Sequence, residues 1–480
     1  MPLLLLLLTL QVTTPAQADG PRAAGDSIAL SLSDAVTRSL RNGDEARSAA
    51  AQVEITDAQV TIARAAGLPQ LRLTGNQSRV FESARASAVG QIFNQPNTYT
   101  AAAALSQSLF QGGRVVAGAR AASNARNASL MDRTEVLAQA SLDVQRAYLQ
   151  ALFAATLAEI QDTSLALATQ RLVQVQQFER AGRSSRYDVL RAGVERANLQ
   201  PAVIQARSDV ELAMVELRRL INIPFDQPVK LTTRLDTAGV LAWVATLRAD
   251  QGPINRAAVR SAELISGARH AAIRVARADL FPTVNINALT GAQAFPQNGF
   301  PTARGRLETV PCPEGGTPGR ICTSQNGGWF GDKSLGIAIA WPIFDGLRAK
   351  GAIDLASAQA RLADLQLTQT RERIASEAAR ARAELARAEA LFSARGQNAS
   401  EAGEAFRLAS LRQSRGLATQ LEVADAQLAL TVARTNEARA VYDLYLAAAG
   451  LARALGRPPQ PFEIPAAQRT ALPLPESRAR

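Results

Sequence analysis

Several residue types are scarce in this sequence of 480 residues, and each scarcity excludes a class of structure or function. There are one histidine, His270, and two cysteines, too few for a histidine-based catalytic triad or a metal centre rich in cysteine and histidine. Aromatic residues make up 5% of the chain although 47% of it is hydrophobic, so alanine supplies much of the apolar content, which favours closely packed helices. Gly112-Gly113 is not followed by the Gly-Lys-Ser/Thr of a phosphate-binding loop. We therefore expect neither an enzyme nor a cofactor site.

Lysine is also scarce, with three residues among the 53 basic ones, and the formal net charge is +11. A basic chain of this kind can bind nucleic acid. Here, however, the arginines are scattered at helical spacing among aspartate and glutamate, without a basic tract or interleaved aromatic residues. This pattern is typical of solvated helix faces, so we expect no nucleic-acid partner.

Long hydrophobic runs are absent, because no stretch reaches the ~18 uninterrupted apolar residues that a membrane-spanning helix needs. The N-terminus carries a short apolar run, Leu3–Leu10, followed by Ala16-Gln17-Ala18 and Asp19. An apolar segment before a small-x-small site is typical of a signal peptide. We expect a signal peptide over 1–18 and export of the mature chain.

The two cysteines, Cys312 and Cys322, flank a Gly- and Pro-rich segment, "PCPEGGTPGRIC". An exported chain meets oxidising conditions, in which a spacing of ten residues across turns favours one loop-closing disulfide. A metal site is the weaker interpretation, because two cysteines without a neighbouring histidine make an incomplete ligand set.

The chain contains an internal repeat. The segment "SLFQGGR" (108–114) reappears as "PIFDGLR" (342–348), and the turn "AGRSSRYDVLRA" (181–192) as "RGLATQLEVADA" (415–426), both at an offset of 234. Earlier, "ARAAGLPQLRL" (63–73) reappears as "ARADLFPTVNI" (276–286) at an offset of 213. The 21 extra residues of the second half fall in the stretch with both cysteines. A duplication explains this pattern better than chance.

Each half has the same predicted layout. A helix, at about 33–66 or 254–280, precedes a strand that starts at "LPQLRL" or "FPTVNI". A second strand follows a polar loop, at 98–110 and 334–344. Apolar residues recur at every second position in these segments, which is the period of a strand. Each half then enters a very long helix.

Those long helices carry a heptad pattern. Leu130, Leu137 and Val144 recur every seven residues in the first half, and Ala378 and Leu385 continue the same register in the second. A period of 3.5 sustained over this length indicates coiled-coil packing. The stretch 114–180 would form a helix about 100 Å long. Shorter helices, at about 186–222 and 420–456, then return along the long ones and end before Pro224 and Pro458.

Strands of about ten residues can span an outer membrane when tilted. Four strands cannot close a barrel, however, and an open edge in lipid leaves backbone groups without hydrogen bonds. The sequence therefore predicts an oligomer, with long helices that project into an aqueous compartment. A closed barrel with a hollow helical projection would form a conduit.

With these features, the sequence resembles the TolC-type outer-membrane efflux proteins, also called outer-membrane factors. The features are the two-fold repeat, the strand starts Leu68-Pro69 and Phe281-Pro282, the "F-x-G-x-R" strand ends and the two turns, and together they cover nearly all of 27–456. The resemblance implies a membrane α+β fold, in which four strands from each of three chains make a 12-stranded outer-membrane barrel that a coiled-coil α-barrel continues into the periplasm.

The resemblance also implies a function and partners. The protein would be the passive outer-membrane exit duct of a tripartite efflux or type I secretion system. A periplasmic adaptor protein would bridge it to a proton-driven or ATP-driven inner-membrane exporter. The expected domains are a signal peptide (1–18), a first repeat (19–222), an equatorial linker (223–253), a second repeat (254–456) with a longer extracellular loop (291–333), and a Pro-rich tail (457–480).

In this family the two turns are periplasmic tips that constrict the tunnel and dock the adaptor. The corresponding tip residues here are Gly182, Arg183, Ser184, Ser185, Gly416, Leu417, Ala418 and Thr419. The family's acidic residues fall on Asp188, Glu422 and Asp425, which in three copies would form a carboxylate ring at the entrance. The alternative is that they are ordinary acids in the first turn of a helix.

This sequence departs from the family at the latch that holds the entrance shut. The family's latch arginine falls on Ala418 and its tyrosine partner on Gln413. The latch is therefore absent or rebuilt with other arginines, for which the candidates are Arg183, Arg186, Arg412 and Arg415.

Aromatic residues gather near the predicted strand ends. They are Tyr99, Phe281, Trp329, Phe330, Trp341 and Phe344, and they suit the aromatic girdle of a membrane barrel or ordinary packing. A second function class stays open, a periplasmic coiled-coil scaffold or adaptor without a barrel, although the strand pairs argue against it.

Overall fold

The computed structural model describes residues 27–82, 96–233, 237–250, 252, 254–296, 298–301, 303–311 and 321–457. The signal peptide expected at 1–18 and the tail beyond Arg457 lie outside these ranges. The chain divides into two compact units, the first formed by Met1–Arg47, Leu137–Pro253 and Ala379–Arg480, and the second by Ser48–Val136 and Ile254–Ala378. Each unit takes segments from both sequence repeats. Among the described helices, none combines the length and the apolar character that a bilayer crossing requires.

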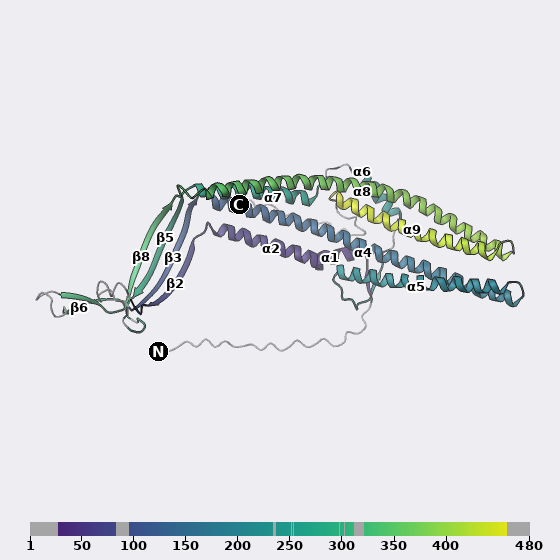
Figure 1. Ribbon diagram of the computed structural model, residues 1–480, viewed down its shortest axis with the longest axis horizontal. Helices are drawn as coiled ribbons and strands as arrows, with labels where there is room; N and C mark the ends of the chain where they lie inside the picture. The colour runs from purple at the N-terminus through teal and green to yellow at the C-terminus, as the bar shows by residue number, and fades with distance from the viewer. Residues whose placement is uncertain are drawn as a thin grey trace. The chain divides into compact units, whose positions relative to one another are not determined.

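The second unit contains a four-stranded antiparallel sheet (Figure 1). Its strands are β2 (Gln70–Arg79), β3 (Asn97–Gln111), β5 (Thr283–Ala294) and β8 (Trp329–Ala340), in the order β2-β3-β5-β8. The repeats meet in the middle of the sheet, where β3 pairs with β5. Strands β2 and β8 are therefore its open edges. A small hairpin of β6 (Leu307–Pro311) and β7 (Ile321–Gln325) lies in the segment by which the second repeat is longer.

The two faces of this sheet differ in polarity. Across the register, Leu71 aligns with Leu105, Ala288 and Leu335. This face carries large apolar side chains and is open to solvent in the single chain, with Leu73 77% and Leu335 79% exposed, but Thr290 and Lys333 also lie on it. The opposite face carries Arg72, Thr74, Asn285, Asn287, Ser334, Gly336 and Ala338. The period-two pattern of the sequence thus sorts apolar from polar and small side chains.

The helix expected over 33–66 is two helices, α1 (Leu32–Asn42) and α2 (Asp44–Ala65). Gly43 separates them in an extended conformation (φ −65°, ψ 144°). A Cβ atom at Gly43 would lie 2.4 Å from the carbonyl oxygen of Ser39, so the break accommodates no larger residue without a shift. In the second repeat, α7 (Ala257–Arg277) and the short 3-10 turn η2 (Ala278–Leu280) precede β5.

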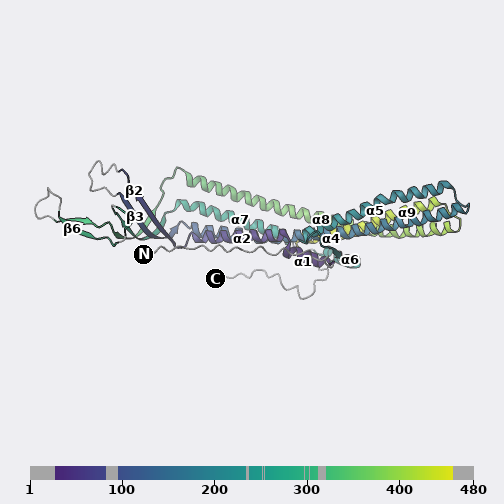
Figure 2. The same ribbon diagram turned by 90° about the horizontal axis from the view of Figure 1, so that it is seen from below.

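The four remaining large helices obey the repeat offset at every boundary. Helices α4 (Arg114–Arg180) and α8 (Arg348–Ser414) each have 67 residues, and α5 (Arg186–Leu220) and α9 (Gln420–Ala454) each have 35. In the first unit, α4 and α5 form one hairpin and α8 and α9 form the other (Figure 2). The seam residues Val144 and Ala151 are buried, as the heptad pattern predicts.

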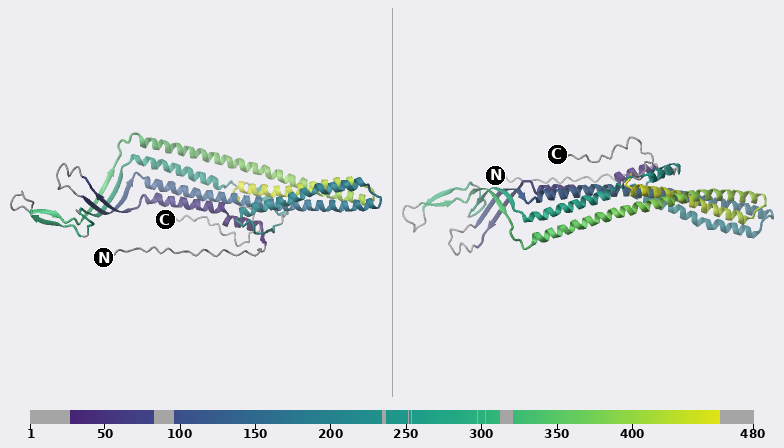
Figure 3. Two further views of the ribbon diagram at one scale, coloured as in Figure 1. Left: turned by 60° about the horizontal axis from the view of Figure 1, so that its bottom comes forward. Right: turned by 90° about the horizontal axis from the view of Figure 1, so that it is seen from above.

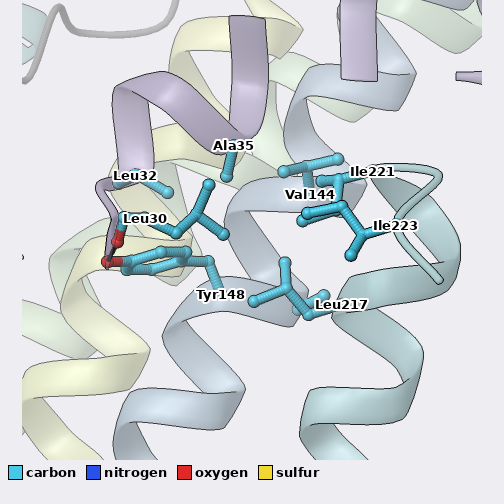
Figure 4. Close-up of a cluster of buried hydrophobic side chains, with 9 residues drawn as sticks. Leu30, Leu32, Ala35, Val144, Tyr148, Leu217, Ile221 and Ile223 are labelled. Atoms are coloured by element: carbon cyan, nitrogen blue, oxygen red, sulfur yellow. Dashed lines mark hydrogen bonds between the residues drawn. The ribbon is translucent and has the colours of Figure 1, made fainter. Parts of the chain in front are cut away.

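The core of the first unit surrounds Tyr148, which is fully buried (Figure 4). Its hydroxyl donates to the carbonyl of Leu30 (2.8 Å) and accepts from the N–H of Thr233 (3.2 Å). It thereby holds the parallel strand pair β1 (Ile28–Leu30) and β4 (Val229–Leu231) against α4. The apolar cluster also contains Leu32, Ala35, Val144, Leu217, Ile221 and Ile223.

The predicted linker 223–253 contains a helix that the sequence did not indicate, α6 (Thr237–Ala249). It buries Val240, Trp243, Val244 and Leu247 and contacts α9. After this helix, Asp250 accepts from the Nε and Nη2 atoms of Arg457 (2.5 and 2.9 Å) and from the N–H of Gly252 (2.8 Å). The linker is therefore bonded to Arg457, the residue that directly follows the second repeat.

This arrangement makes one part of the stability depend on pH. The hydrogen bonds from Arg457 and Gly252 lower the pKa of Asp250 from 3.8 to about 2. A depressed pKa means that the stabilisation is complete above pH ~4 and is lost as the pH falls through the folded value. We expect the stability difference between the natural protein and Asp250→Asn to be constant near neutral pH, to shrink as the pH falls below ~4 and to be lost only below pH ~2 in urea titrations. A difference that persists unchanged at pH ~2 would contradict this.

Candidate functional site

The first part of the site is the end of each hairpin (Figure 3). Both long helices end at a glycine with positive φ, Gly182 (71°) and Gly416 (75°). The N–H of the next residue, Arg183 or Leu417, donates to the carbonyl five positions back (2.8 Å in both tips). This is the Schellman motif, which favours glycine because it needs a left-handed backbone. The interruption of the helical pattern is thus a helix stop.

A helix start follows each stop. At the first tip, Ser185 accepts from the N–H of Asp188 (3.2 Å), whose carboxylate accepts from the N–H of Ser185 (3.0 Å). At the second tip, Thr419 and Glu422 form the same reciprocal pair (3.3 Å in both directions). These capping boxes satisfy backbone donors that a helix start leaves open. The two tip turns therefore share one hydrogen-bond pattern, which the sequence encodes twice.

The three predicted acids lie in different surroundings. The carboxylate of Asp188 accepts hydrogen bonds from Ser185 and Ser184, which lower its pKa. Glu422 accepts from the hydroxyl of Thr419 (3.2 Å). Asp425 is exposed and lines a groove on α9. Asp188 and Glu422 thus cap helices, which supports the first-turn alternative for these two, whereas Asp425 has no such role.

Two of the four candidate arginines contact an acid of their own hairpin. Arg186 lies 3.6 Å from Glu179, and Arg412 lies 3.9 Å from Glu422. Both arginines are well exposed, so each pair contributes little to stability.

The other two candidate arginines do not form ion pairs within the described part of the chain. The guanidinium of Arg183 lies over the ring of Phe178 (5.2 Å to its centroid). Arg415 is exposed. In the turn that follows it, Gly416, Leu417 and Thr419 are also exposed and Ala418 is half-buried. Across the described residues, no ion pair joins one tip to the other.

The capping box gives a direct test of the tip geometry. Replacing Ser185 with alanine removes the acceptor for the N–H of Asp188 and is expected to destabilise the start of α5 by about 1 kcal/mol. Faster amide hydrogen exchange in the first turn of α5 would report the loss. Ser184→Ala is the matched control, because the Ser184 hydroxyl bonds only the carboxylate and not the backbone. Equal exchange in the two variants would contradict the assignment.

A buried polar cluster, which sequence reasoning missed, joins the two hairpins. Arg171 of α4 donates to Glu195 of α5 (2.8 Å) and to Gln427 of α9 (2.5 Å). The amide of Gln427 donates to the carbonyl of Ser164 (3.2 Å), whose hydroxyl is 3.0 Å from that of Thr431. Arg171 and Gln427 are buried. We call these five residues the Arg171 cluster.

Sequence reasoning also missed Asp279, which lies in η2, between α7 and β5. Asp279 forms ion pairs with Arg114 and with Arg348 (3.3 Å for the second). These are the arginines of the repeated "F-x-G-x-R" motif, so one carboxylate serves both copies of the motif. The position 213 residues earlier is Ala66, so the first repeat carries no such acid.

The six aromatic candidates form two groups at opposite ends of the sheet. Tyr99 aligns through Ala294 with Trp329 at one end, and Phe330 follows. Phe281, Trp341 and Phe344 lie at the other end, next to the pair of Thr283 and Ala340. Each group contains a tryptophan that donates to a backbone carbonyl, Trp329 to Pro301 (2.9 Å) and Trp341 to Leu280 (3.2 Å).

Two further interpretations concern the cysteines, a disulfide and a metal site. Cys322 lies in β7 opposite Val310, but Cys312 is outside the described residues, so the disulfide stays a prediction. In the described part of the chain, no group of acidic, histidine and cysteine side chains could hold a metal ion.

The sequence model of the outer membrane efflux protein family matches residues 36–222 and 251–457. No curated protein is similar enough in sequence to match the chain. Among solved structures, the chain is similar to the outer membrane protein VceC of Vibrio cholerae, with 19% identity over 89% of this chain and 97% of that one, at a TM-score of 0.68. It is also similar to the outer membrane channel CmeC of Campylobacter jejuni (14% identity, 88% and 85% of the chains, TM-score 0.71).

A third similar structure is the open state of the outer membrane channel MtrE of Neisseria gonorrhoeae, with 22% identity over 89% of both chains and a TM-score of 0.67. These likenesses show a shared fold. The family model covers the larger part of both repeats, including the strands and the hairpin tips described above. The chain therefore belongs to the outer membrane efflux protein family, the TolC-type channels.

Proposed function

We propose that three copies of this chain form the exit duct of a tripartite efflux or type I secretion system in the outer membrane. The observation that carries the proposal is the four-stranded sheet, whose edges β2 and β8 are open and whose apolar face is exposed. An exposed apolar sheet with two open edges requires both lipid and further strands. Three such sheets, joined β8 to β2, would close a 12-stranded barrel.

The dimensions of the sheet support this placement. Strands β5 and β8 have 12 residues each, or about 40 Å. At a tilt near 45° they would rise about 28 Å, close to the height of the apolar band of outer-membrane barrels. The two aromatic groups would then lie at the two interfaces. The polar face, with Asn285, Asn287 and Ser334, would line the duct.

The helices would continue the duct into the periplasm, and the tips would contact an adaptor that connects them to an inner-membrane exporter. We also propose the domain boundaries given above, with cleavage after residue 18. A periplasmic scaffold without a barrel is the second candidate, but it leaves the exposed apolar face unexplained. The duct predicts a heat-sensitive trimer in detergent extracts of outer membranes and ion conductance in planar bilayers. A monomer in the soluble periplasmic fraction would contradict it.

Charge at the entrance can be tested separately. If Glu422 and Asp425 belong to a carboxylate ring, the double variant Glu422→Gln with Asp425→Asn should lose cation preference and block by divalent cations, because three copies would remove six charges. The measurement is single-channel current in potassium chloride with and without added magnesium. Unchanged preference and unchanged block would remove the ring hypothesis and leave the capping role of Glu422.

A further inference from the structure

Two basic side chains lie on the apolar face of the sheet. Lys333 of β8 aligns with Thr290 of β5, and Arg79 is the last residue of β2, on the same face as Leu73. Both are exposed, and neither forms an ion pair with any residue that the structure describes. A charge on the lipid face of a barrel is unfavourable at the midplane and tolerated near an interface. The position of these two residues therefore has to be explained.

Both residues lie toward the end of the sheet that is remote from the helices (Figure 1). The helices join the sheet at the end that carries Gln70 and Ala340, so in the proposed duct the Trp329 end would face the exterior. Lys333 is four residues from Trp329, about 13 Å along the strand, or about 10 Å in depth at a tilt near 40°. A lysine stem at this depth can extend along the apolar surface and bring its ammonium to the headgroups.

An aromatic cluster on the same face marks the level of the headgroups. The ring of Phe300 contacts the rings of Tyr99 and Trp329 edge-on, with centroids 5.3 and 6.1 Å apart. The indole of Trp329 also donates to the carbonyl of Pro301 (2.9 Å). Such amphipathic rings are typical of a membrane interface. The ammonium of Lys333 would thus reach the layer in which lipid phosphates lie.

The open edge of β8 is already occupied at this end. The N–H of Trp329 donates to the carbonyl of Ala303 (3.0 Å), and the carbonyl of Trp329 accepts from the N–H of Gly305 (2.7 Å). The next residue whose backbone groups point to the open edge is Gly331, so ten residues, 331–340, are left for a further strand. Strand β2 also has ten residues. In a closed barrel, 331–340 would therefore pair with 70–79 of the next copy.

The backbone supports this register in two ways. The N–H of Val80 donates to the carbonyl of Pro96 (2.8 Å), so the odd-numbered residues of β2 point their backbone groups to its open edge, as those of β8 do. Following the pairs from Gln70 across the sheet to Gly336 then leads to Thr74 of the next copy. A stagger of four residues per copy gives 12 strands a tilt of about 35°, which is normal for outer-membrane barrels.

This register brings the two basic residues together. Lys333 lies opposite Gln77 of the next copy and diagonal to Arg79 of that copy, about 7–8 Å away. Gly331 lies directly opposite Arg79, and a Cβ atom at Gly331 would meet nothing within 4 Å in the single chain. Glycine inside a strand often marks the close approach of a ligand. In the described strands this face carries no acidic residue, since Asp332 lies on the opposite face.

We propose that Lys333 of one copy and Arg79 of the next together bind a phosphate group of an outer-leaflet lipid, at three sites around the barrel. The inference rests on the proposed duct. The ammonium supplies a point charge, and the guanidinium can donate two parallel hydrogen bonds to the phosphate oxygens. The guanidinium already lies over the ring of Phe81 (5.4 Å to its centroid), which is 90% exposed and would contact the same lipid.

Native mass spectrometry of the detergent-purified trimer with added diphosphoryl lipid A tests the site. Lys333→Met and Arg79→Met should each weaken binding about tenfold or more, because each removes a hydrogen bond between charged groups. Lys350→Met, beyond the sheet at the start of α8, and Arg72→Met, on the opposite face of β2, are the matched controls and should bind as the natural protein does. Dephosphorylated lipid A should bind the natural protein no better than lipid A binds Lys333→Met.

Equal binding of lipid A by Lys333→Met and Lys350→Met, or equal binding of the phosphorylated and dephosphorylated lipids, would overturn the inference. The register is tested by Asn76→Cys with Ser334→Cys in a Cys312→Ser and Cys322→Ser background, which places two thiols opposite each other across the junction. Covalent oligomers on non-reducing gels are expected, and their absence would contradict a site shared by two copies. A protein that stays monomeric and carries no current in planar bilayers would contradict the duct itself, whereas a conducting trimer with unchanged lipid binding in the variants would contradict the lipid site alone.

Discussion

Replacing Arg256 with methionine is expected to destabilise the folded protein by about 3 kcal/mol, the lower end of the range for breaking a buried ion pair. Arg256 is 5% exposed and lies at the start of α7. Its Nε and Nη2 atoms donate to Glu135 of α4 (3.2 Å from Nε), and its Nη1 atom donates to Glu377 of α8 (3.3 Å). Methionine would fill much of the volume but leave two carboxylates without their shared cation. Because both glutamates are partly exposed, water would recover part of the loss.

The matched control is Arg260→Met, one turn further along α7. Arg260 is 67% exposed, and its nitrogen lies 3.8 Å from Glu263, a pair of the kind that contributes at most about 1 kcal/mol. Urea titrations of the detergent-solubilised protein, followed by tryptophan fluorescence, give the comparison. Similar unfolding midpoints for the two variants would show that the buried triad does not hold α7 to the long helices.

Leu217→Ala has the second large expected effect, a loss of about 2–5 kcal/mol. Leu217 of α5 has no exposed surface and packs with Tyr148 and Ile221 in the core cluster (Figure 4). Truncation removes buried methyl groups and leaves a cavity in the core cluster, which the surrounding side chains fill only in part. The loss should appear in the same urea titrations as a lower midpoint with an unchanged slope.

Helix α5 supplies its own control for this prediction. Leu212→Ala changes the same residue type five positions earlier, but Leu212 is 63% exposed in the single chain. In the same titrations this substitution should change stability by less than about 0.5 kcal/mol. A cost at Leu212 equal to that at Leu217 would show that burial in the cluster does not determine the effect.

Repeating patterns made the helices and strands predictable. The heptad pattern and the offset of 234 located α4, α5, α8 and α9 almost to the residue, and the alternation of apolar residues located β2, β3 and β5. The strand expected at 334–344 is β8 at Trp329–Ala340, so it begins five residues earlier and ends before Trp341. Glycine at 182 and 416 and the capping residues Ser185 and Thr419 marked the tips. Each of these signals is local in sequence, because it depends on backbone preference or on one periodic face.

Features that depend on a distant partner were not predictable. The scattered arginines were interpreted as solvated helix faces, yet Arg171 and Arg256 are buried against acids and amides from other helices. Nothing in their own segments distinguishes them from Arg260. The helix at Thr237–Ala249 was missed for a similar reason, since its apolar residues are explained by contact with α9 and not by a long periodic pattern of their own.

Helices α4 and α8 have equal lengths, and so do α5 and α9, which indicates that insertions and deletions in them are unfavourable. One residue added to α4 before Arg171 would turn that side chain by about 100° around the helix, and its buried hydrogen bond to Gln427 would be lost unless α8 or α9 changed as well. The two repeats have diverged at most positions, yet the 67-residue and 35-residue helices still match. Insertions are tolerated before the long helices, where the 21-residue difference lies. The long helices of the two repeats therefore differ by substitution and not by length, so the number of residues between strand end and tip is the same in both.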